Sequence, residues 1–329
     1  MLLDIKSKIT YNTYMSNFKG EFMKKTKWSI NEAKDLTSKV IIVTGANSGL
    51  GYEATKIFAS KNATVIMACR SLEKANEAKE AIIEVYEKAN LVPMVLDLGS
   101  LKSIKSFANE FKSKYNRLDI LLNNAGIMTI PYGKTEDGFE IQNGVNHLGH
   151  FALTSQLFKL IKNTSESRIV NVSSLAHRQG KMDFDNYLFE KGNYKKMKSY
   201  AKSKLSNLLF TYELDRRIKE KGHDVKVLAA HPGVSSTNLG RYVVGKNGDS
   251  PFLKFALKLG QPADLGCLPE VRAALDESAQ GGEYYGPDSL IQMRGNPIRV
   301  KSNKRSHNIE DAKKLWNFSE QLTNLKFDI

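Results

Sequence analysis

The fold of this chain is decided by the stretch Val40-Ile41-Ile42-Val43-Thr44-Gly45-Ala46-Asn47-Ser48-Gly49-Leu50-Gly51. Its first part is a short run of β-branched residues, which is typical of a strand buried on both faces of a parallel sheet. The rest has the spacing Gly-x3-Gly-x-Gly and leads into a helical pattern. Glycines suit such a turn, because the backbone must bend tightly and approach a pyrophosphate at the free N–H groups of the helix. The stretch therefore predicts a nucleotide site, with a purely structural turn as the alternative.

Strand-like and helix-like segments alternate after this stretch. We expect further strands at 63–69, 92–96, 118–122, 168–172 and 225–230. We expect helices at about 50–60, 72–89, 101–115, 144–162 and 198–220. Strands separated by single helices favour right-handed crossovers and one parallel sheet. The predicted fold class is α/β, a single-domain Rossmann-type doubly wound parallel sheet with helices on both faces. Segments 175–197 and 234–262 interrupt this alternation of strands and helices, and the second segment is interpreted as a loop or lid.

Composition and charge exclude several classes of protein. Apolar residues make up 41% of the 329 residues, which is ordinary globular usage. The formal charge is +14, but residues 1–39 and 291–329 each hold eight Lys and Arg against four acids. Since no run of basic residues is interleaved with aromatics, we expect no nucleic-acid partner, with a polyanion-binding face as the alternative. The longest apolar runs are too short to span a membrane, and the two cysteines favour a reducing, cytoplasmic location.

The second predicted strand ends with Cys69-Arg70-Ser71. Sites for NAD usually carry an acid near this position, which accepts a hydrogen bond from the ribose 2′-hydroxyl. A carboxylate would repel a 2′-phosphate, whereas the guanidinium of Arg70 can bind one through paired hydrogen bonds. Arg70 therefore predicts NADP(H) rather than NAD(H), with an exposed arginine that opens a helix as the alternative.

The predicted helix at 198–220 carries Tyr200 and Lys204, which share one face because they are four residues apart. A tyrosine is a poor base at neutral pH, but a neighbouring ammonium favours the phenolate and lowers its pKa. Upstream, the predicted strand at 168–172 runs into Ser173 and Ser174. Ligands bind at the carboxyl ends of parallel strands, so either serine is a candidate to bind a substrate carbonyl, with loop capping as the alternative. No Gly-x-Ser-x-Gly motif surrounds them, which argues against a serine hydrolase.

Over residues 39–290 these motifs together resemble the short-chain dehydrogenase/reductase superfamily. The matching positions are Thr44-Gly45-x3-Gly49-x-Gly51, Asp97, Asn123-Asn124-Ala125-Gly126, Asn146, Ser174, Tyr200 with Lys204, and Pro232-Gly233 with Thr237. Within the superfamily, Ala68-Cys69-Arg70, Asn146-His147-Leu148-Gly149-His150-Phe151 and Tyr200-Ala201-Lys202-Ser203-Lys204-Leu205 are similar to the retinol dehydrogenase and WW-domain oxidoreductase branch. Without the N-terminal apolar segment of its membrane-anchored members, the chain looks more like the soluble bacterial oxidoreductases of that branch.

The resemblance implies a role for each matching residue. Tyr200 would be the general acid/base, and Ser174 would orient the carbonyl. Lys204 would lower the pKa of the tyrosine and bind the nicotinamide ribose, while Asn146 would hold a water in the proton relay. The implied cofactor-binding residues are Gly45, Asn47, Ser48, Gly49, Leu50, Gly51, Arg70, Asp97, Leu98, Asn123, Ala125, Gly126, Tyr200, Lys204, Pro232, Gly233 and Thr237.

We therefore expect an NADP(H)-dependent oxidoreductase that interconverts an alcohol and a carbonyl on a hydrophobic small molecule. Alternatives are a non-catalytic NADP(H)-binding sensor, and a lyase or epimerase on a nucleotide sugar, which the glycine spacing disfavours. The scattered histidines lack metal-ligand spacing, so no metal site is expected. The predicted organisation is a polar extension at 1–38, the catalytic domain at 39–290, and an extension at 291–329 whose helix docks onto the domain. A homo-oligomer is left open.

Overall fold

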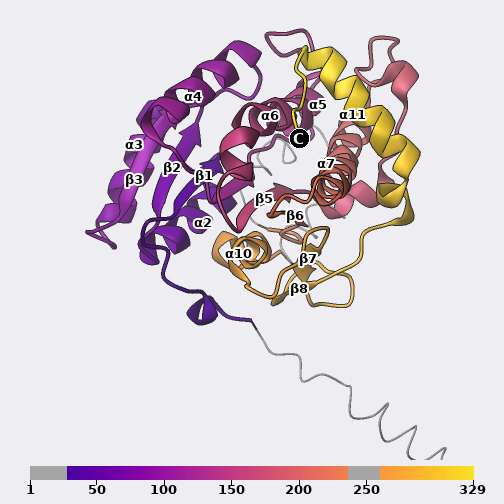
Figure 1. Ribbon diagram of the computed structural model, residues 1–329. Coiled ribbons are helices and arrows are strands. Elements are labelled where there is room, and N and C mark those ends of the chain that lie inside the picture. The colour runs from indigo at the N-terminus through magenta and orange to yellow at the C-terminus, as the bar shows by residue number, and fades with distance from the viewer. Residues whose placement is uncertain (1–27, 236–259) are drawn as a thin grey trace, which may run out of the picture.

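The computed structural model describes residues 28–235 and 260–329. These residues form one eight-stranded sheet with the order β3-β2-β1-β4-β5-β6-β7-β8, in which only the pairing of β7 with β8 is antiparallel (Figure 1). The strands are β1 Val40–Thr44, β2 Thr64–Cys69, β3 Asn90–Val95, β4 Ile120–Asn123, β5 Ser167–Val172, β6 Val225–Ala230, β7 Tyr284–Pro287 and β8 Pro297–Arg299. The predicted fold class is confirmed: this is a Rossmann-type sheet whose strand order reverses at β1.

Helices cover both faces of the sheet. The α-helices are α2 Gly49–Ser60, α3 Leu72–Ile83, α4 Leu101–Lys114, α5 Ile141–Asn143, α6 Gly149–Lys162, α7 Lys196–Glu220, α9 Ala263–Gly266, α10 Leu268–Leu275 and α11 Ile309–Thr323. Side chains of α2, α3 and α10 share one buried cluster, and those of α4, α6 and α7 share another. Helix α11 lies along α7 on the outside of the second layer (Figure 1).

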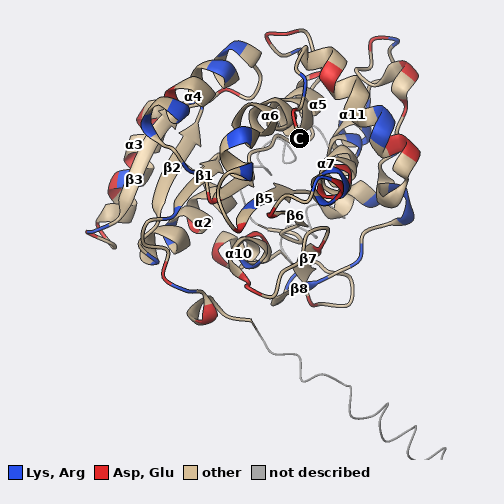
Figure 2. Ribbon diagram, in the orientation of Figure 1, with Lys and Arg blue, Asp and Glu red and all other residues tan. Residues whose placement is uncertain are grey.

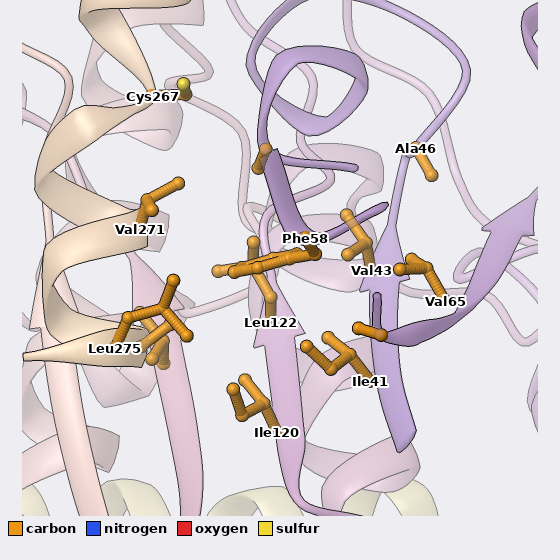
Figure 3. Close-up of a cluster of buried hydrophobic side chains, with 14 of the residues drawn as sticks. Ile41, Val43, Ala46, Phe58, Val65, Ile120, Leu122, Cys267, Val271 and Leu275 are labelled. Carbon is orange, nitrogen blue, oxygen red and sulfur yellow. The ribbon is translucent and has the colours of Figure 1, made fainter. Parts of the chain in front are cut away.

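The central strand β1 shows why the sheet forms here. Its residues are all buried, and they alternate between the two faces. Ile41 and Val43 belong to the cluster under α2 and α10 (Figure 3), whereas Val40 and Ile42 belong to the cluster under α4 and α6. A strand that is apolar on both sides is stable only with helices on both faces, which is the arrangement found.

The structure differs from the sequence prediction in several elements. Helix α3 ends at Ile83 rather than near residue 89, and the single helix expected at 144–162 begins with a π-helical turn, Gly144–Leu148, before α6. The sequence analysis did not anticipate α10, β7 or β8. Since β8 pairs with β7, the sheet continues into the segment predicted as a C-terminal extension. Of the predicted extension at 1–38, residues 1–27 lie outside the described residues. Of the predicted loop or lid at 234–262, residues 236–259 lie outside them.

Charges are mixed over the described surface. Lysines and acids both occur along α3 and α11, whereas α4 carries four lysines and one acid, Glu110 (Figure 2). In the part of the chain that the structure describes, none of the helices has both the length and the apolar character needed to cross a membrane.

The C-terminal helix is held by an aromatic cluster. The Trp316 ring of α11 is 3% exposed and lies with its centroid 5.4 Å from Phe151 of α6 and 4.8 Å from Phe327. The Arg217 guanidinium of α7 stacks on it at 4.3 Å. The helix predicted near the C-terminus is therefore packed against α6 and α7.

We predict that Trp316→Ala lowers the free energy of unfolding by about 3–5 kcal/mol, because it empties a buried aromatic site. Ile309→Ala, at an exposed first position of the same helix, is the control and should change this free energy by no more than about 0.5 kcal/mol. Urea denaturation measures both. Equal effects for the two variants would contradict the docking of α11.

Candidate functional site

The candidate site is built where the carboxyl ends of β1, β4, β5 and β6 meet. The glycine turn follows β1, Asn123-Asn124-Ala125-Gly126 begins at the end of β4, Ser173 and Ser174 follow β5, and Pro232 and Gly233 follow β6. These segments are far apart in the sequence, yet parallel pairing brings their ends to one edge of the sheet. The strand-order reversal lies beside β1, where ligands bind in open α/β sheets.

The glycine turn is packed too closely against its neighbours to admit side chains. Gly45 and Gly49 have φ values of +70° and +58°, which favour glycine. A Cβ on Gly51 would lie 2.4 Å from the Gly45 carbonyl oxygen and 2.5 Å from Asn124 Nδ2. Ser48 precedes α2 without capping it through its side chain, and no other side chain among the residues that the structure describes accepts from the first N–H groups of this helix. The turn therefore fits a pyrophosphate, which needs free amides at a helix N-terminus.

Thr44 joins the glycine turn to the loop after β4. Its Oγ1 accepts hydrogen bonds from the backbone N–H groups of Asn124 at 3.0 Å and Ala125 at 2.9 Å. Asn124 Nδ2 in turn donates to the Thr44 carbonyl oxygen at 2.7 Å. The two walls of the predicted cofactor site are thus fixed to each other by the last residue of β1.

Arg70, predicted to bind the 2′-phosphate, and the predicted cofactor-binding residues Asp97 and Leu98 lie just beyond the ends of β2 and β3. Arg70 is exposed directly after β2, and Ser71 caps α3 by accepting from the Lys74 N–H. Asp97 Oδ1 accepts from the Gly99 N–H at 2.8 Å, and Leu98 is buried. Asn123 is also buried and donates to Thr154 and Asn171, so its side chain lies inside the second layer rather than beside the glycine turn.

Tyr200 and Lys204 lie side by side on α7, both buried. The Lys204 ammonium is 5.9 Å from the centroid of the Tyr200 ring and donates to the Val172 carbonyl oxygen at 3.0 Å. Burial raises the pKa of Tyr200 to about 12, and a hydrogen bond with the Ser174 hydroxyl opposes this rise. Burial therefore outweighs the lowering of the pKa that we expected from the neighbouring ammonium.

The two serines after β5 have different partners. Ser173 Oγ donates to the Lys204 carbonyl oxygen at 2.8 Å. Ser174 Oγ accepts from the Ala176 N–H at 3.2 Å, and so caps the 3-10 turn Leu175–Gln179. The capping that we considered as an alternative does occur, but it uses a lone pair and leaves the Ser174 hydroxyl proton for another acceptor. Of the two serines, Ser174 is the one that lies beside Tyr200.

The side chain of Asn146 binds the segment that follows Gly126. Its Oδ1 accepts from the Ile127 N–H at 2.8 Å, and its Nδ2 donates to the Ile127 carbonyl oxygen at 2.9 Å and to Ser203 Oγ at 2.9 Å. Both hydrogens of the side-chain amide thus have acceptors within the protein. A water bound by this residue would donate to the second lone pair of Oδ1 or to the backbone carbonyl oxygen.

The sequence analysis overlooked two buried acids near the site. Glu140 accepts from the Asn143 N–H at 2.9 Å and from Ser199 Oγ at 2.8 Å, and so holds the residue that precedes Tyr200. Glu270 of α10 is 2% exposed, and its Oε1 has no hydrogen-bond partner among the described residues. The only sequence signal for Glu270 is one acid within the apolar run of α10.

Lys204 and Glu270 influence each other electrostatically. Burial lowers the pKa of Lys204 to about 8, and the negative charge of Glu270 opposes this lowering. Burial likewise raises the pKa of Glu270 to about 8, against the positive charge of Lys204.

The remaining predicted residues follow β6. Gly233 has a φ of +70°, and a Cβ there would lie 2.3 Å from the Met293 carbonyl oxygen. The Pro232 carbonyl oxygen accepts from Gln261 Nε2 at 3.1 Å. Thr237 lies outside the described residues. Among the described residues, we find no group of three or more His, Cys, Asp or Glu that could hold a metal ion.

Comparison with known proteins identifies the family. Residues 39–247 match the family model described as short chain dehydrogenase. Human retinol dehydrogenase 13 is 39% identical over 297 residues, which cover 88% of this chain and 86% of that protein. The solved structure of an uncharacterized protein from Mycobacterium Paratuberculosis is 36% identical, with a TM-score of 0.76, and the match covers 92% of this chain and all of that one.

A structure of a short chain dehydrogenase from Shigella flexneri complexed with NADP has the same fold, with a TM-score of 0.60, 20% identity, and coverage of 77% of this chain and 98% of that one. The resemblance inferred from the motifs, including that to the retinol dehydrogenase branch, is thereby confirmed. The chain belongs to the short-chain dehydrogenase family, in its retinol dehydrogenase-like branch, and is an oxidoreductase that acts on CH–OH donors.

Proposed function

We propose that this protein interconverts an alcohol and a carbonyl on a hydrophobic small molecule, with NADP(H) as the cofactor and Tyr200 as the general acid/base. The observation that carries the proposal is the grouping of Tyr200, Lys204 and Ser174 at the strand edge that also holds the glycine turn. A protein that only sensed the cofactor would need the turn and Arg70 but not this polar group.

The geometry supports an assignment of residues to the parts of the cofactor. The amides after Ser48 would bind the pyrophosphate, and Gly45 and Gly51 allow α2 to approach the loop after β4 closely. Arg70 would bind the 2′-phosphate, and Lys204 the nicotinamide ribose. When bound, the nicotinamide supplies or accepts the hydride, which is chemistry that amino-acid side chains lack.

Tyr200 would move the proton that accompanies the hydride. Because burial keeps its pKa near 12, the phenol is protonated at neutral pH and is ready to donate to a carbonyl oxygen during reduction. The ammonium of Lys204 would then stabilise the phenolate that forms, and the hydroxyl of Ser174 would donate a hydrogen bond to the substrate oxygen. The same groups act in reverse for oxidation.

Two observations support the finer assignments of cofactor and substrate. The exposed Arg70 at the end of β2 suits a 2′-phosphate, and a protein of the same fold was crystallised with NADP. Retinol dehydrogenase 13, a relative at 39% identity, is named for an apolar alcohol, and the half-buried Ile127 and Met128 follow Gly126 at the site edge. The cytoplasmic location and the oligomeric state stay predictions.

We predict that Tyr200→Phe lowers kcat for NADPH-dependent reduction of apolar aldehydes by about 10²–10⁴-fold, because the proton donor is removed. The dissociation constant for NADPH should stay nearly unchanged. Tyr212→Phe is the control, since Tyr212 lies on the same helix but donates to or accepts from Ser302, outside the site. Full activity of Tyr200→Phe would overturn its role, and NADPH binding without turnover of any substrate by the wild type would favour the sensor.

We predict that Arg70→Glu lowers the ratio of kcat/KM with NADPH to kcat/KM with NADH by about 10- to 100-fold, through loss of a charge-assisted hydrogen bond and added repulsion. Lys88→Glu makes the same change of charge at an exposed position beyond α3 and should leave the ratio unchanged. An equal ratio in both variants would remove Arg70 from the 2′-phosphate site.

We predict that NADPH binding by the wild type weakens as the pH rises through about 8, because Lys204 is charged below its pKa and neutral above it. Glu270→Gln removes the negative charge that Glu270 gains as the pH approaches its own pKa of about 8, so the midpoint of the loss should move to a lower pH. Asp264→Asn, an exposed acid on α9, should not shift it. Titration of the NADPH dissociation constant against pH measures the effect, and an unshifted midpoint in Glu270→Gln would show that Glu270 does not act on Lys204.

A further inference from the structure

A histidine that the proposed chemistry does not use lies between the two halves of the site. His150, in the first turn of α6, is 2% exposed. Its Nδ1 lies 3.0 Å from the backbone carbonyl oxygen of Asn146, and its Nε2 lies 3.0 Å from Thr44 Oγ1. Both ring nitrogens therefore have partners, one beside the predicted proton relay and the other at the glycine turn.

The Asn146 partner determines the tautomer. A carbonyl oxygen can only accept, so Nδ1 must carry the proton and Nε2 must offer a lone pair. Burial lowers the pKa of His150 to about 4, with the hydrogen bond to Asn146 opposing this and the charge of Lys204 adding to it. The titratable groups that face His150 are Lys204 from α7 and His147 from the π-helical turn. The ring is therefore neutral at physiological pH.

The lone pair on Nε2 fixes the Thr44 hydroxyl. Thr44 Oγ1 accepts from the Asn124 and Ala125 N–H groups, which occupies both of its lone pairs. Its one proton can then go to His150 Nε2 at 3.0 Å or to the Leu122 carbonyl oxygen at 3.3 Å, and the histidine is the closer acceptor. A histidine protonated at Nε2 would instead direct an N–H at an oxygen with no lone pair left.

The Nδ1 atom of the ring binds the backbone of a π-helical turn. Asn146 lies in the π-helical turn Gly144–Leu148, and such turns are frequent at functional sites. Its side chain holds Ile127, while its carbonyl receives the His150 N–H. One imidazole thus connects β1, the loop after β4 and the residue predicted to serve the proton relay.

We propose that His150 is a positioning residue. As the Nδ1–H tautomer, it holds the Thr44 hydroxyl and the Asn146 carbonyl at a fixed distance from each other. It thereby fixes the position of the loop at 123–126 relative to the backbone of Asn146, the residue predicted to serve the proton relay. The inference rests on the proposed function for its effect on catalysis. The tautomer itself can be tested without any substrate or cofactor.

The first experiment observes the full-length wild-type protein labelled with 15N-histidine. Long-range 1H–15N correlations should show His150 as the Nδ1–H tautomer, with no titration between about pH 6 and 8, where a free imidazole titrates. The His150→Gln spectrum assigns the signal, and Thr44→Val should shift the Nε2 resonance by removing its donor. An Nε2–H tautomer, or titration near about 6.5, would overturn the proposal.

The second experiment is a double-mutant cycle on the NADPH dissociation constant and on kcat. His150→Phe should weaken binding by about tenfold. Thr44→Val should weaken it further, because it also leaves the Asn124 and Ala125 N–H groups without their acceptor, and the double variant should be no weaker than Thr44→Val alone. His150→Gln can accept from Thr44 and donate to Asn146, so it should recover part of the loss. Additive losses, or no recovery by glutamine, would overturn the connection.

His147→Phe is the matched control. His147 is equally buried three residues earlier, but its Nε2 lies 3.0 Å from Ser319 Oγ of α11, away from the site. The variant should change stability but neither kcat nor NADPH binding, and matching losses in the two phenylalanine variants would show a merely structural role for His150. Absence of NADPH binding in the wild type would overturn the proposed function and the catalytic part of this inference, whereas the wrong tautomer overturns the role of His150 alone.

Discussion

The site depends on the hydroxyl of Thr44, which accepts two backbone N–H groups from the loop after β4. Parallel pairing of β1 with β4 aligns the strands but leaves the loops beyond their ends free to diverge. The hydroxyl removes that freedom, and Asn124 returns a hydrogen bond to the Thr44 carbonyl oxygen. A valine would fit the strand equally well, yet it could not accept either amide. The end of β1 thereby becomes one wall of the proposed cofactor site.

Close packing around this junction explains the glycines. A Cβ on Gly45 would lie 3.2 Å from Ala125 Cα, and one on Gly51 would meet Asn124 Nδ2 at 2.5 Å. The first helix therefore approaches the loop after β4 as closely as its backbone allows, and its N–H groups remain free for an anion. The amide of Asn146 continues the same framework by holding Ile127, and Ser203 connects it to α7. The glycine turn and Tyr200 thus share one hydrogen-bonded framework.

Much of this could be predicted from the sequence, because it depends on local patterns. The β-branched run at 40–44 is a strand with the predicted limits, and the spacing of Tyr200 and Lys204 does place them on one helix face. The π-helical turn at Gly144–Leu148 could not be predicted from periodicity, because residues 142–154 are buried on nearly all sides and show no amphipathic pattern in which the extra residue would be visible. Strands β7 and β8 are only four and three residues long and carry little pattern. The roles of His150 and Glu270 depend on partners far away in the sequence.

Burial determines the charge state of the site more strongly than neighbouring charges do. Tyr200 has its pKa raised to about 12 although an ammonium lies 5.9 Å from its ring, because desolvation opposes the phenolate. The same desolvation lowers the pKa of Lys204 to about 8 and that of His150 to about 4. A neutral phenol and a neutral imidazole can each hold one defined proton, which sets the direction of every hydrogen bond around them. In the mechanism that we propose, the donors and acceptors of this site are assigned before a substrate oxygen arrives, so little reorganisation is left for the proposed proton transfer.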